Sequence, residues 1–290
     1  MLRPVIVGLD GSPESLAAAH WAAREAILRG LPLHLVNAWF WQPHDVPDAQ
    51  DTEAHKHWST RHLREARADL TARHPLLPVT TEQVSDLAAP ALLDRAAQAE
   101  LLVLGSRGHS AVAGFLLGSV GMQVLAHAQS PVVMVRADQP ATADRTGDEV
   151  VVALQGLGAP AAPLLEFAFA AAAARGATLR AVHAWSLPPA YGYDAAVLRT
   201  ADEDGGVASR QERALADALR PWREKFPQVP VAEQAEQGYA GEVVLRAAAR
   251  AGLAVVGRRV HRPALGMRIG PVTHAVLHHV PAPVAVVPHD

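Results

Sequence analysis

The chain has 290 residues, a net charge of −3 and a hydrophobic fraction of 50%. This length suits about two domains of ordinary size, and the balanced charge, which includes no basic block, argues against nucleic-acid binding as the main function. The chain has no cysteine, which excludes disulfides, zinc–thiolate sites and cysteine nucleophiles.

The amino-terminal stretch MLRPVIVGLDGSPES leads directly into a strand-like segment. It lacks the basic start and the long apolar run of a signal peptide. The apolar run LEFAFAAAAA at 165–174 is too short to cross a bilayer. We therefore expect a cytoplasmic protein that neither enters a membrane nor binds nucleic acid.

The first half of the chain alternates short β-branched runs with longer alanine-rich segments. A helix is expected to begin after Ser12 as N-cap, with Pro13 at its first position, and to end at Gly30. Five runs are expected to form strands: PVIVGLD, LHLVNAW, PVTTEQV, ELLVLGS and PVVMVRA. Further helices are expected at Thr52–Arg73, Ala88–Gln98 and Gly118–Ala128.

Three of the expected strands, VIVGL, LLVLG and VVMV, are apolar on both faces. This pattern is typical of parallel strands that are covered by helices on each side. Together with the alternation of strand and helix, it predicts an α/β fold with a doubly wound, five-stranded parallel sheet in each copy of the repeat described next.

The second half of the chain repeats the first. Arg29-Gly30 and Ala38-Trp39 both recur 146 residues later, and LLVLGSRG at 101–108 and PVVMVR at 131–136 both recur 152 residues later, as LAVVGRRV and PVAVVP. The second copy thus gains about six residues in its middle. Such constant offsets indicate one duplicated domain. We assign residues 1–137 to a first domain, 138–147 to a linker of small and polar residues, and 148–290 to a second domain.

Two loops of the first copy are candidates for ligand binding, because ligands of such sheets lie beyond the carboxyl ends of the strands. The first expected strand ends in Asp10-Gly11-Ser12, and the fourth is followed by Gly105, Gly108, Gly118 and Ser119. Glycine N–H groups and a helix start can hold phosphate oxygens, and Asp10 can accept a hydrogen bond from a ribose hydroxyl or a base amine. The alternative interpretation is that these residues only cap helices and form turns.

With these residues in view, the chain resembles a tandem universal stress protein over nearly its whole length. ATP-binding members of that family carry an aspartate after the first strand and G-x2-G-x9-G-S/T after the fourth, as here. The resemblance implies two Rossmann-like domains of the adenine-nucleotide α-hydrolase type and a regulatory function in stress responses. It also implies bound ATP, alone or with Mg²⁺. No obvious base pairs with Asp10, so we expect no enzymatic turnover.

The resemblance places adenine near Asp10 and the backbone of Ala38, and phosphates near Gly108, Gly118, Ser119 and Val120. Arg107 and His109 are either further phosphate ligands or solvated loop residues. The candidate nucleotide-binding residues are Asp10, Gly11, Ser12, Ala38, Gly105, Arg107, Gly108, His109, Gly118, Ser119 and Val120.

The second copy departs from this pattern. Gln155 replaces the aspartate, Val260 replaces the second glycine and Pro271 replaces the serine. Proline removes an N–H group from the helix start, so we predict weak or no ATP binding in this copy. The family likeness implies that the second copy pairs with the first within one chain. Whether whole chains also form a homodimer is not determined by the sequence. The arginines of its loop, among them Arg258 and Arg262, either attract an anion or are solvated.

Other chemistry finds little support in the sequence. His274 and His278 have the spacing of two metal ligands on one helix face, but no carboxylate lies nearby, so we expect no metal site and interpret them as structural or surface residues. No GxxxxGKS/T, GxSxG or HExxH motif is present, and we expect no catalytic residues. A slow ATPase and a nucleotide-independent interaction protein remain the alternatives. The long segments after Trp41 and Trp185 are either interaction flaps or linkers.

Overall fold

The structure is a computed structural model that describes residues 2–39, 49–106, 118–137, 149–186, 206–260 and 269–290. The chain divides into two compact units, Met1–Ala141 (unit 1) and Thr142–Asp290 (unit 2). The long segments that follow Trp41 and Trp185 in the sequence lie almost entirely outside the described residues.

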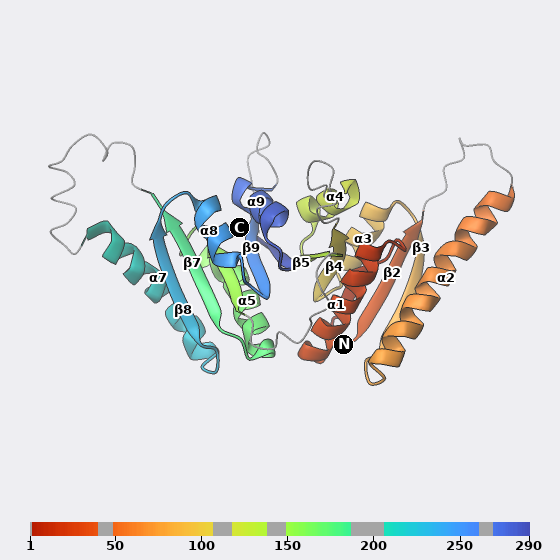
Figure 1. Ribbon diagram of the computed structural model, residues 1–290, viewed down its shortest axis with the longest axis horizontal. Coiled ribbons are helices and arrows are strands. Elements are labelled where there is room, and N and C mark those ends of the chain that lie inside the picture. Colours follow the sequence, from red (N-terminus) through yellow and green to blue (C-terminus); the bar gives the residue numbers. More distant parts are fainter. Residues whose placement is uncertain (1, 40–48, 107–117, 138–148, 187–205, 261–268) are drawn as a thin grey trace. The chain divides into compact units, whose positions relative to one another are not determined.

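Unit 1 is a five-stranded parallel sheet with the strand order β3-β2-β1-β4-β5 (Figure 1). This arrangement confirms the predicted doubly wound α/β fold. Its elements in chain order are β1 (Val5–Gly8), α1 (Pro13–Arg29), β2 (Leu33–Trp39), α2 (Ala49–Arg73), β3 (Val79–Ser85), α3 (Ala88–Ala96), β4 (Leu101–Ser106), α4 (Ser119–His127) and β5 (Val132–Arg136).

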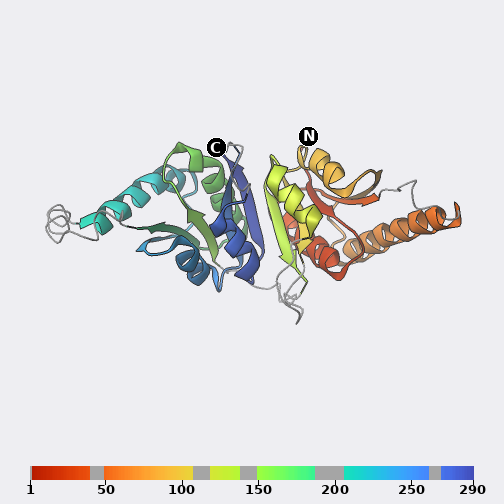
Figure 2. The same ribbon diagram turned by 90° about the horizontal axis from the view of Figure 1, so that it is seen from above.

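Helices cover both faces of the sheet of unit 1 (Figure 2). Helices α1 and α2 pack on one face and on each other, whereas α3 packs on the other face and against α4. The strands β1, β4 and β5 between these layers are almost entirely buried, as their apolar sequences predict. The edge strand β3 is half-exposed, and its sequence VTTEQVS is correspondingly polar.

Helix α1 has the ends that its sequence predicts. The Ser12 side chain accepts a hydrogen bond from the Ser15 N–H group, and Gly30 closes the helix in the left-handed conformation with φ 64°. The other helices differ from expectation by a few residues: α2 begins three residues earlier, α3 ends at Ala96, and Gly118 and Ala128 are caps of α4 rather than members of it.

Unit 2 has the same topology. Its strand order β8-β7-β6-β9-β10 matches β3-β2-β1-β4-β5 of unit 1 strand by strand. Its first helix is preceded by a 3₁₀ turn, so the chain leaves β6 differently from the way it leaves β1. The elements are β6 (Val150–Leu154), η1 (Ala159–Ala161), α5 (Ala162–Arg175), β7 (Leu179–Trp185), α7 (Gly206–Lys225), β8 (Val231–Gln237), α8 (Ala240–Ala248), β9 (Leu253–Arg259), α9 (Pro271–His279) and β10 (Val284–His289).

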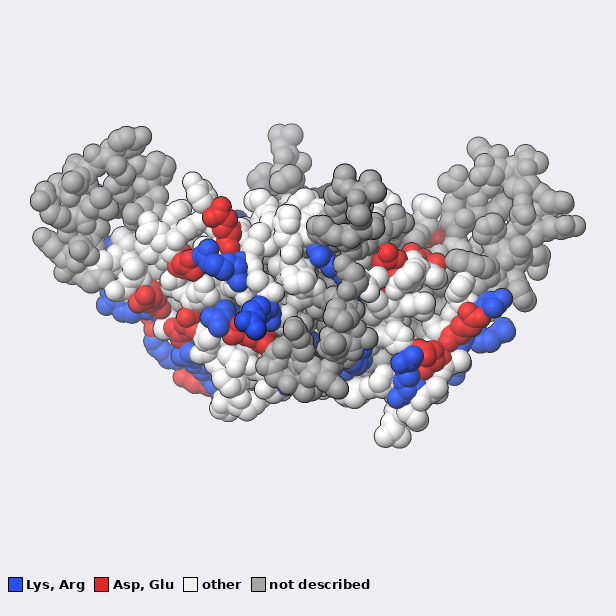
Figure 3. Space-filling view, in the orientation of Figure 1, with Lys and Arg blue, Asp and Glu red and all other residues white. Residues whose placement is uncertain are grey.

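The outer face of α2 carries charges of alternating sign (Figure 3). Arg61 pairs with Glu65 at 2.7 Å and Arg73 with Asp69 at 2.8 Å, each one helical turn apart. Such exposed pairs contribute little to stability but keep the helix surface polar. In the described parts of the chain, no helix is long and apolar enough to span a bilayer.

Candidate functional site

The loop after β1 is held by the Asp10 carboxylate. Its Oδ1 accepts hydrogen bonds from the Ser12 N–H group at 2.9 Å and from the Ser12 hydroxyl at 2.5 Å. Gly11 between them has φ 82°, a conformation that only glycine adopts without strain. These contacts fix an exposed carboxylate directly beside the first turn of α1.

The hydrogen bonds of this loop also set the charge of Asp10. Partial burial acts to raise the pKa of the Asp10 carboxyl, but the hydrogen bonds from Ser12 and Ser15 together outweigh it, and the pKa lies below its ordinary value. Asp10 is therefore ionised at neutral pH and can only accept hydrogen bonds. It suits a hydroxyl or amine donor and would repel a phosphate.

The end of β2 lies beside this loop. The buried Asn37 side chain donates a hydrogen bond to the Leu9 carbonyl at 2.7 Å, which ties β2 to the residue that precedes Asp10. Its amide oxygen is buried and has no hydrogen-bond partner among the described residues. A buried acceptor without a partner is costly, so a donor from a ligand would be favourable here. Ala38, the residue predicted to offer its backbone to adenine, follows directly.

Gly105 at the end of β4 is required by the packing of the protein itself. A Cβ atom at this position would lie 2.5 Å from the backbone carbonyl carbon and oxygen of Glu14 in α1. The first glycine of the predicted phosphate motif therefore lets α1 approach β4, and its presence does not depend on a ligand. Sequence reasoning assigned it only to ligand binding or to a turn.

Gly118 and α4 offer a different environment. A Cβ atom at Gly118 would meet nothing within 4 Å, and no described side chain caps the amino terminus of α4. Ser119 is exposed and Val120 half-buried. An uncapped helix start has free N–H groups and a partial positive charge, which together favour an anion.

Strand pairing brings these two loops to one edge of the sheet. Strands β1 and β4 are parallel neighbours, so the Asp10 loop and the segment leading to α4 both leave the carboxyl edge. The predicted ligands Arg107, Gly108 and His109 lie outside the described residues. The described part of the site thus has a hydrogen-bond acceptor on one side and an anion-favouring helix start on the other.

Unit 2 has different side chains at the start of the corresponding helix. The Thr273 hydroxyl of α9 donates a hydrogen bond to the Gly257 carbonyl at 2.9 Å, which ties the first turn of the helix to the end of β9. The equivalent residue in α4 is Gly121, which has no side chain. Pro271 also removes the first N–H group of α9.

The strand ends of unit 2 also differ from those of unit 1 at the positions of Asn37 and Asp10. His183 occupies the position equivalent to Asn37, and its ring nitrogens contact the Leu154 carbonyl at 3.0 Å and the Gln211 side chain at 3.2 Å. Each nitrogen thereby has an oxygen partner within the protein. With Gln155 in place of Asp10, this edge also lacks the carboxylate.

The described residues contain no group of three or more histidine, aspartate or glutamate side chains that could hold a metal ion. The rings of His274 and His278 lie stacked on α9 with their centroids 4.0 Å apart. Two imidazoles fall short of the three or four protein ligands of a typical zinc site.

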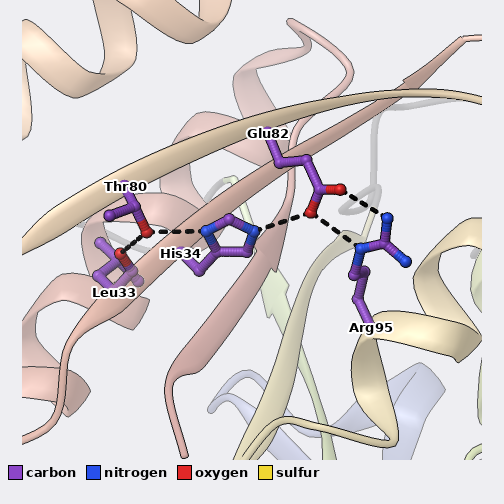
Figure 4. Close-up of polar contacts among 5 residues, drawn as sticks. All are labelled: Leu33, His34, Thr80, Glu82 and Arg95. Atoms are coloured by element: carbon purple, nitrogen blue, oxygen red, sulfur yellow. Dashed lines mark hydrogen bonds and ion pairs between the residues drawn. The ribbon is translucent and has the colours of Figure 1, made fainter.

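A second polar cluster lies at the opposite end of the sheet of unit 1 (Figure 4). Glu82 of β3 accepts hydrogen bonds from Arg95 of α3 at 2.8 and 2.5 Å, and lies 3.1 Å from the His34 ring of β2. The other nitrogen of His34 contacts the Thr80 hydroxyl at 2.8 Å. Hydrogen bonds from Arg95 lower the pKa of the Glu82 carboxyl to about 2; partial burial opposes this and His34 assists it.

The low pKa of Glu82 predicts a pH-dependent contribution to stability. Glu82→Gln should lower the free energy of unfolding by about 1 kcal/mol at neutral pH, as for a half-exposed ion pair. A depressed carboxyl pKa stabilises the fold above the ordinary value of 4.5, and this contribution is lost as the pH falls towards about 2. In urea unfolding, the difference between variant and wild type should therefore shrink below pH 4.5. Glu65→Gln, in an exposed pair on α2, is the control and should change stability less. A pH-independent difference would contradict the prediction.

Comparison with known proteins assigns the family. The family model described as the universal stress protein family matches residues 1–136 and, a second time, residues 148–288. The chain belongs to the universal stress protein family. The resemblance noted from the sequence, a tandem of two such domains, is thereby confirmed.

Relatives of the universal stress protein family share the tandem length. Universal stress protein Rv2005c of Mycobacterium tuberculosis (strain ATCC 25618 / H37Rv) is 34% identical over 296 residues, which cover 97% of this chain and 96% of the relative. A universal stress protein of Mycolicibacterium smegmatis is 31% identical over 299 residues, with 98% and 96% covered. A crystal structure of a universal stress protein from Archaeoglobus fulgidus DSM 4304 covers 98% of both chains with a TM-score of 0.73 at 18% identity, which shows the same fold.

Proposed function

We propose that this universal stress protein binds one ATP per chain in unit 1 and serves as a nucleotide-dependent regulatory protein in a stress response. The observation that carries the proposal is the difference between the two units. The start of α4 offers the N–H group and hydroxyl of Ser119 and is open at Gly118, whereas Pro271 at the same position of α9 has neither group and the Thr273 hydroxyl is hydrogen-bonded to the Gly257 carbonyl. We therefore expect an anion to be held at the start of α4 and not at the start of α9.

The residues of unit 1 suit the parts of ATP separately. The Asp10 carboxylate would accept hydrogen bonds from ribose hydroxyls, and the backbone at Ala38 would contact adenine. The N–H groups of Gly118, Ser119 and Val120, with the Ser119 hydroxyl, would hold phosphate oxygens. In the sequence, Arg107, Gly108 and His109 belong to the same loop. Mg²⁺ would enter with the phosphates, because it is commonly held by a few protein oxygens and the phosphates themselves.

Unit 2 would serve as a partner domain within the chain rather than as a second binding site. This part of the proposal rests on the family likeness and on the loss of the aspartate, the second glycine and the serine in the second copy. A further pairing of whole chains into a homodimer would be measured by sedimentation of the purified protein.

Isothermal titration of the full chain with ATP tests the proposal. We expect one site per chain, and Asp10→Asn should weaken binding about tenfold, because the loss of charge weakens its hydrogen bonds to donors. Gln155→Ala, at the equivalent position of unit 2, is the matched control and should leave binding unchanged. Two equal sites, or no binding to the wild type, would contradict the proposal.

Thermal unfolding separates the two alternative functions. A ligand present at 100 times its Kd stabilises the folded state by about 2.7 kcal/mol, whereas a nucleotide-independent interaction protein would show no shift with ATP. Release of inorganic phosphate above that of a binding-deficient variant would instead support a slow ATPase.

A further inference from the structure

Unit 1 has a second concave surface, far from the Asp10 loop. This groove has a volume of about 1290 Å³ and lies at the amino ends of β1, β2 and β3. It is bordered by Leu2–Pro4, the end of α1, the turn at 74–78 and α3. The cluster of His34, Glu82 and Arg95, which Figure 4 draws, belongs to its lining. In a parallel sheet the amino ends of all strands lie at one edge and the carboxyl ends at the other. The groove and the candidate nucleotide site therefore lie at opposite edges of one sheet.

The groove exposes large apolar side chains. Leu76 is 97% exposed, Leu2 69% and Ile27 48%, and all three line the same groove. Scattered apolar residues are ordinary on a protein surface, but several that line one concavity indicate a binding surface. The neighbouring prolines Pro4, Pro32, Pro75 and Pro78 form a further apolar part of the wall.

The second copy of the domain shows that the fold does not need these residues. The turn that holds Leu76 recurs in unit 2 with the same hydrogen bond across it, from Leu77 N–H to the His74 carbonyl and from Val229 N–H to the Phe226 carbonyl. In unit 2 the exposed position of Leu76 is taken by Gln228. Equivalent positions of the helix ends and strand starts carry Ala173 for Ile27 and Glu149 for Pro4.

The charges of the groove favour an anion. Glu82 is the one carboxylate in its lining, and it is already neutralised by Arg95. Arg3, at the rim next to Leu2, donates a hydrogen bond to the Ala97 carbonyl, and it forms no ion pair with any carboxylate in the described part of the chain. The lining therefore carries an excess of positive charge beside its apolar wall.

We propose that this groove binds a small amphipathic anion, with a hydrocarbon chain against Ile27 and Leu76 and a carboxylate head at Arg3. A fatty acid has this chemistry. A guanidinium holds a carboxylate through two parallel hydrogen bonds, and the groove is large enough for a small-molecule ligand rather than a flat protein interface. The groove shares no residue with the candidate nucleotide site at the carboxyl edge.

Titration of the full-length protein with decanoate tests the proposal. Decanol, which lacks the negative charge, and acetate, which lacks the hydrocarbon chain, are the comparison probes. We expect decanoate to bind one site per chain, and decanol and acetate to bind far more weakly. The double variant Ile27→Ala, Leu76→Gln introduces the residues of unit 2, which this fold already tolerates. It should weaken decanoate binding by about tenfold or more, because apolar contact is lost. Arg3→Gln should weaken decanoate but leave decanol unchanged.

The same variants give the outcomes that overturn the inference. An absence of decanoate binding to the wild type would overturn it, and so would equal binding by the double variant. Decanoate-induced changes in the NMR methyl spectrum of unit 2 alone would also overturn it. Circular dichroism of each variant checks that it is folded, and ATP titration of the double variant should match the wild type, which separates failure here from failure of the nucleotide proposal.

Discussion

Gly105→Ala is expected to destabilise unit 1 by about 3 kcal/mol, at the upper end of the usual cost of overpacking. The added methyl group would lie 2.5 Å from the backbone carbonyl of Glu14, and a backbone cannot move aside as the end of a side chain can. Helix α1 would have to shift, together with Ser15, whose hydroxyl contacts the Asp10 N–H group at 3.4 Å. Urea unfolding of the full chain measures the effect as a lower midpoint for the transition of unit 1.

Two other glycines provide controls for this prediction. Gly257→Ala, at the equivalent position of unit 2, would meet the ring of His289, a side chain that can rotate away, so its cost should be smaller. Gly118→Ala would meet nothing within 4 Å at a φ of −57° and should leave stability within about 0.5 kcal/mol of the wild type. Equal destabilisation by all three substitutions would show that close packing is not the reason for Gly105.

Ser119→Pro is expected to abolish measurable ATP binding, with an affinity loss of about a hundredfold or more, because two hydrogen bonds to a charged group are removed. The substitution introduces the residue that α9 has as Pro271. Proline is favoured at the first helical position, and Gly118 before it has ψ 155°, which proline tolerates in its predecessor. The helix should therefore form, and isothermal titration would report the loss of the anion site alone.

Ser119→Ala separates the contributions of backbone and side chain. Alanine keeps the N–H group and loses the hydroxyl, so its affinity should lie between those of wild type and Ser119→Pro. Unchanged ATP binding by Ser119→Pro, in a variant with normal unfolding, would place the nucleotide away from α4 and contradict the proposed site.

The architecture of both units follows from local sequence signals. Strands such as β4 and β5 are apolar on both faces because helices cover both, and the sequence shows this directly. The ends of α1 follow from Ser12, Pro13 and Gly30, each of which acts on its own neighbours. Helix α2 begins three residues before its predicted start, because helix ends depend on weak contacts that short-range patterns do not determine.

The features that sequence reasoning missed depend on contacts between distant segments. One example is the close approach of Gly105 to Glu14, and another is the hydrogen bond from Thr273 to Gly257. Each contact joins residues that are far apart in the sequence. The groove at the amino edge escaped notice for the same reason, since Leu2, Ile27 and Leu76 converge only in the fold. One available signal was the change from Leu76 to Gln228 between the two copies.

The Thr273 bridge in unit 2 has a consequence for the fate of the protein when nucleotide is scarce. The bridge ties the first turn of α9 to the end of β9 without a ligand, so under the proposed function ATP would not change the stability of unit 2, whereas that of unit 1 would rise and fall with the nucleotide supply. On starvation, unit 1 would lose this stabilisation and be cut by a protease more readily than when ATP is bound. Within one chain, the stability of unit 1 would then depend on the ATP concentration, and the stability of unit 2 would not.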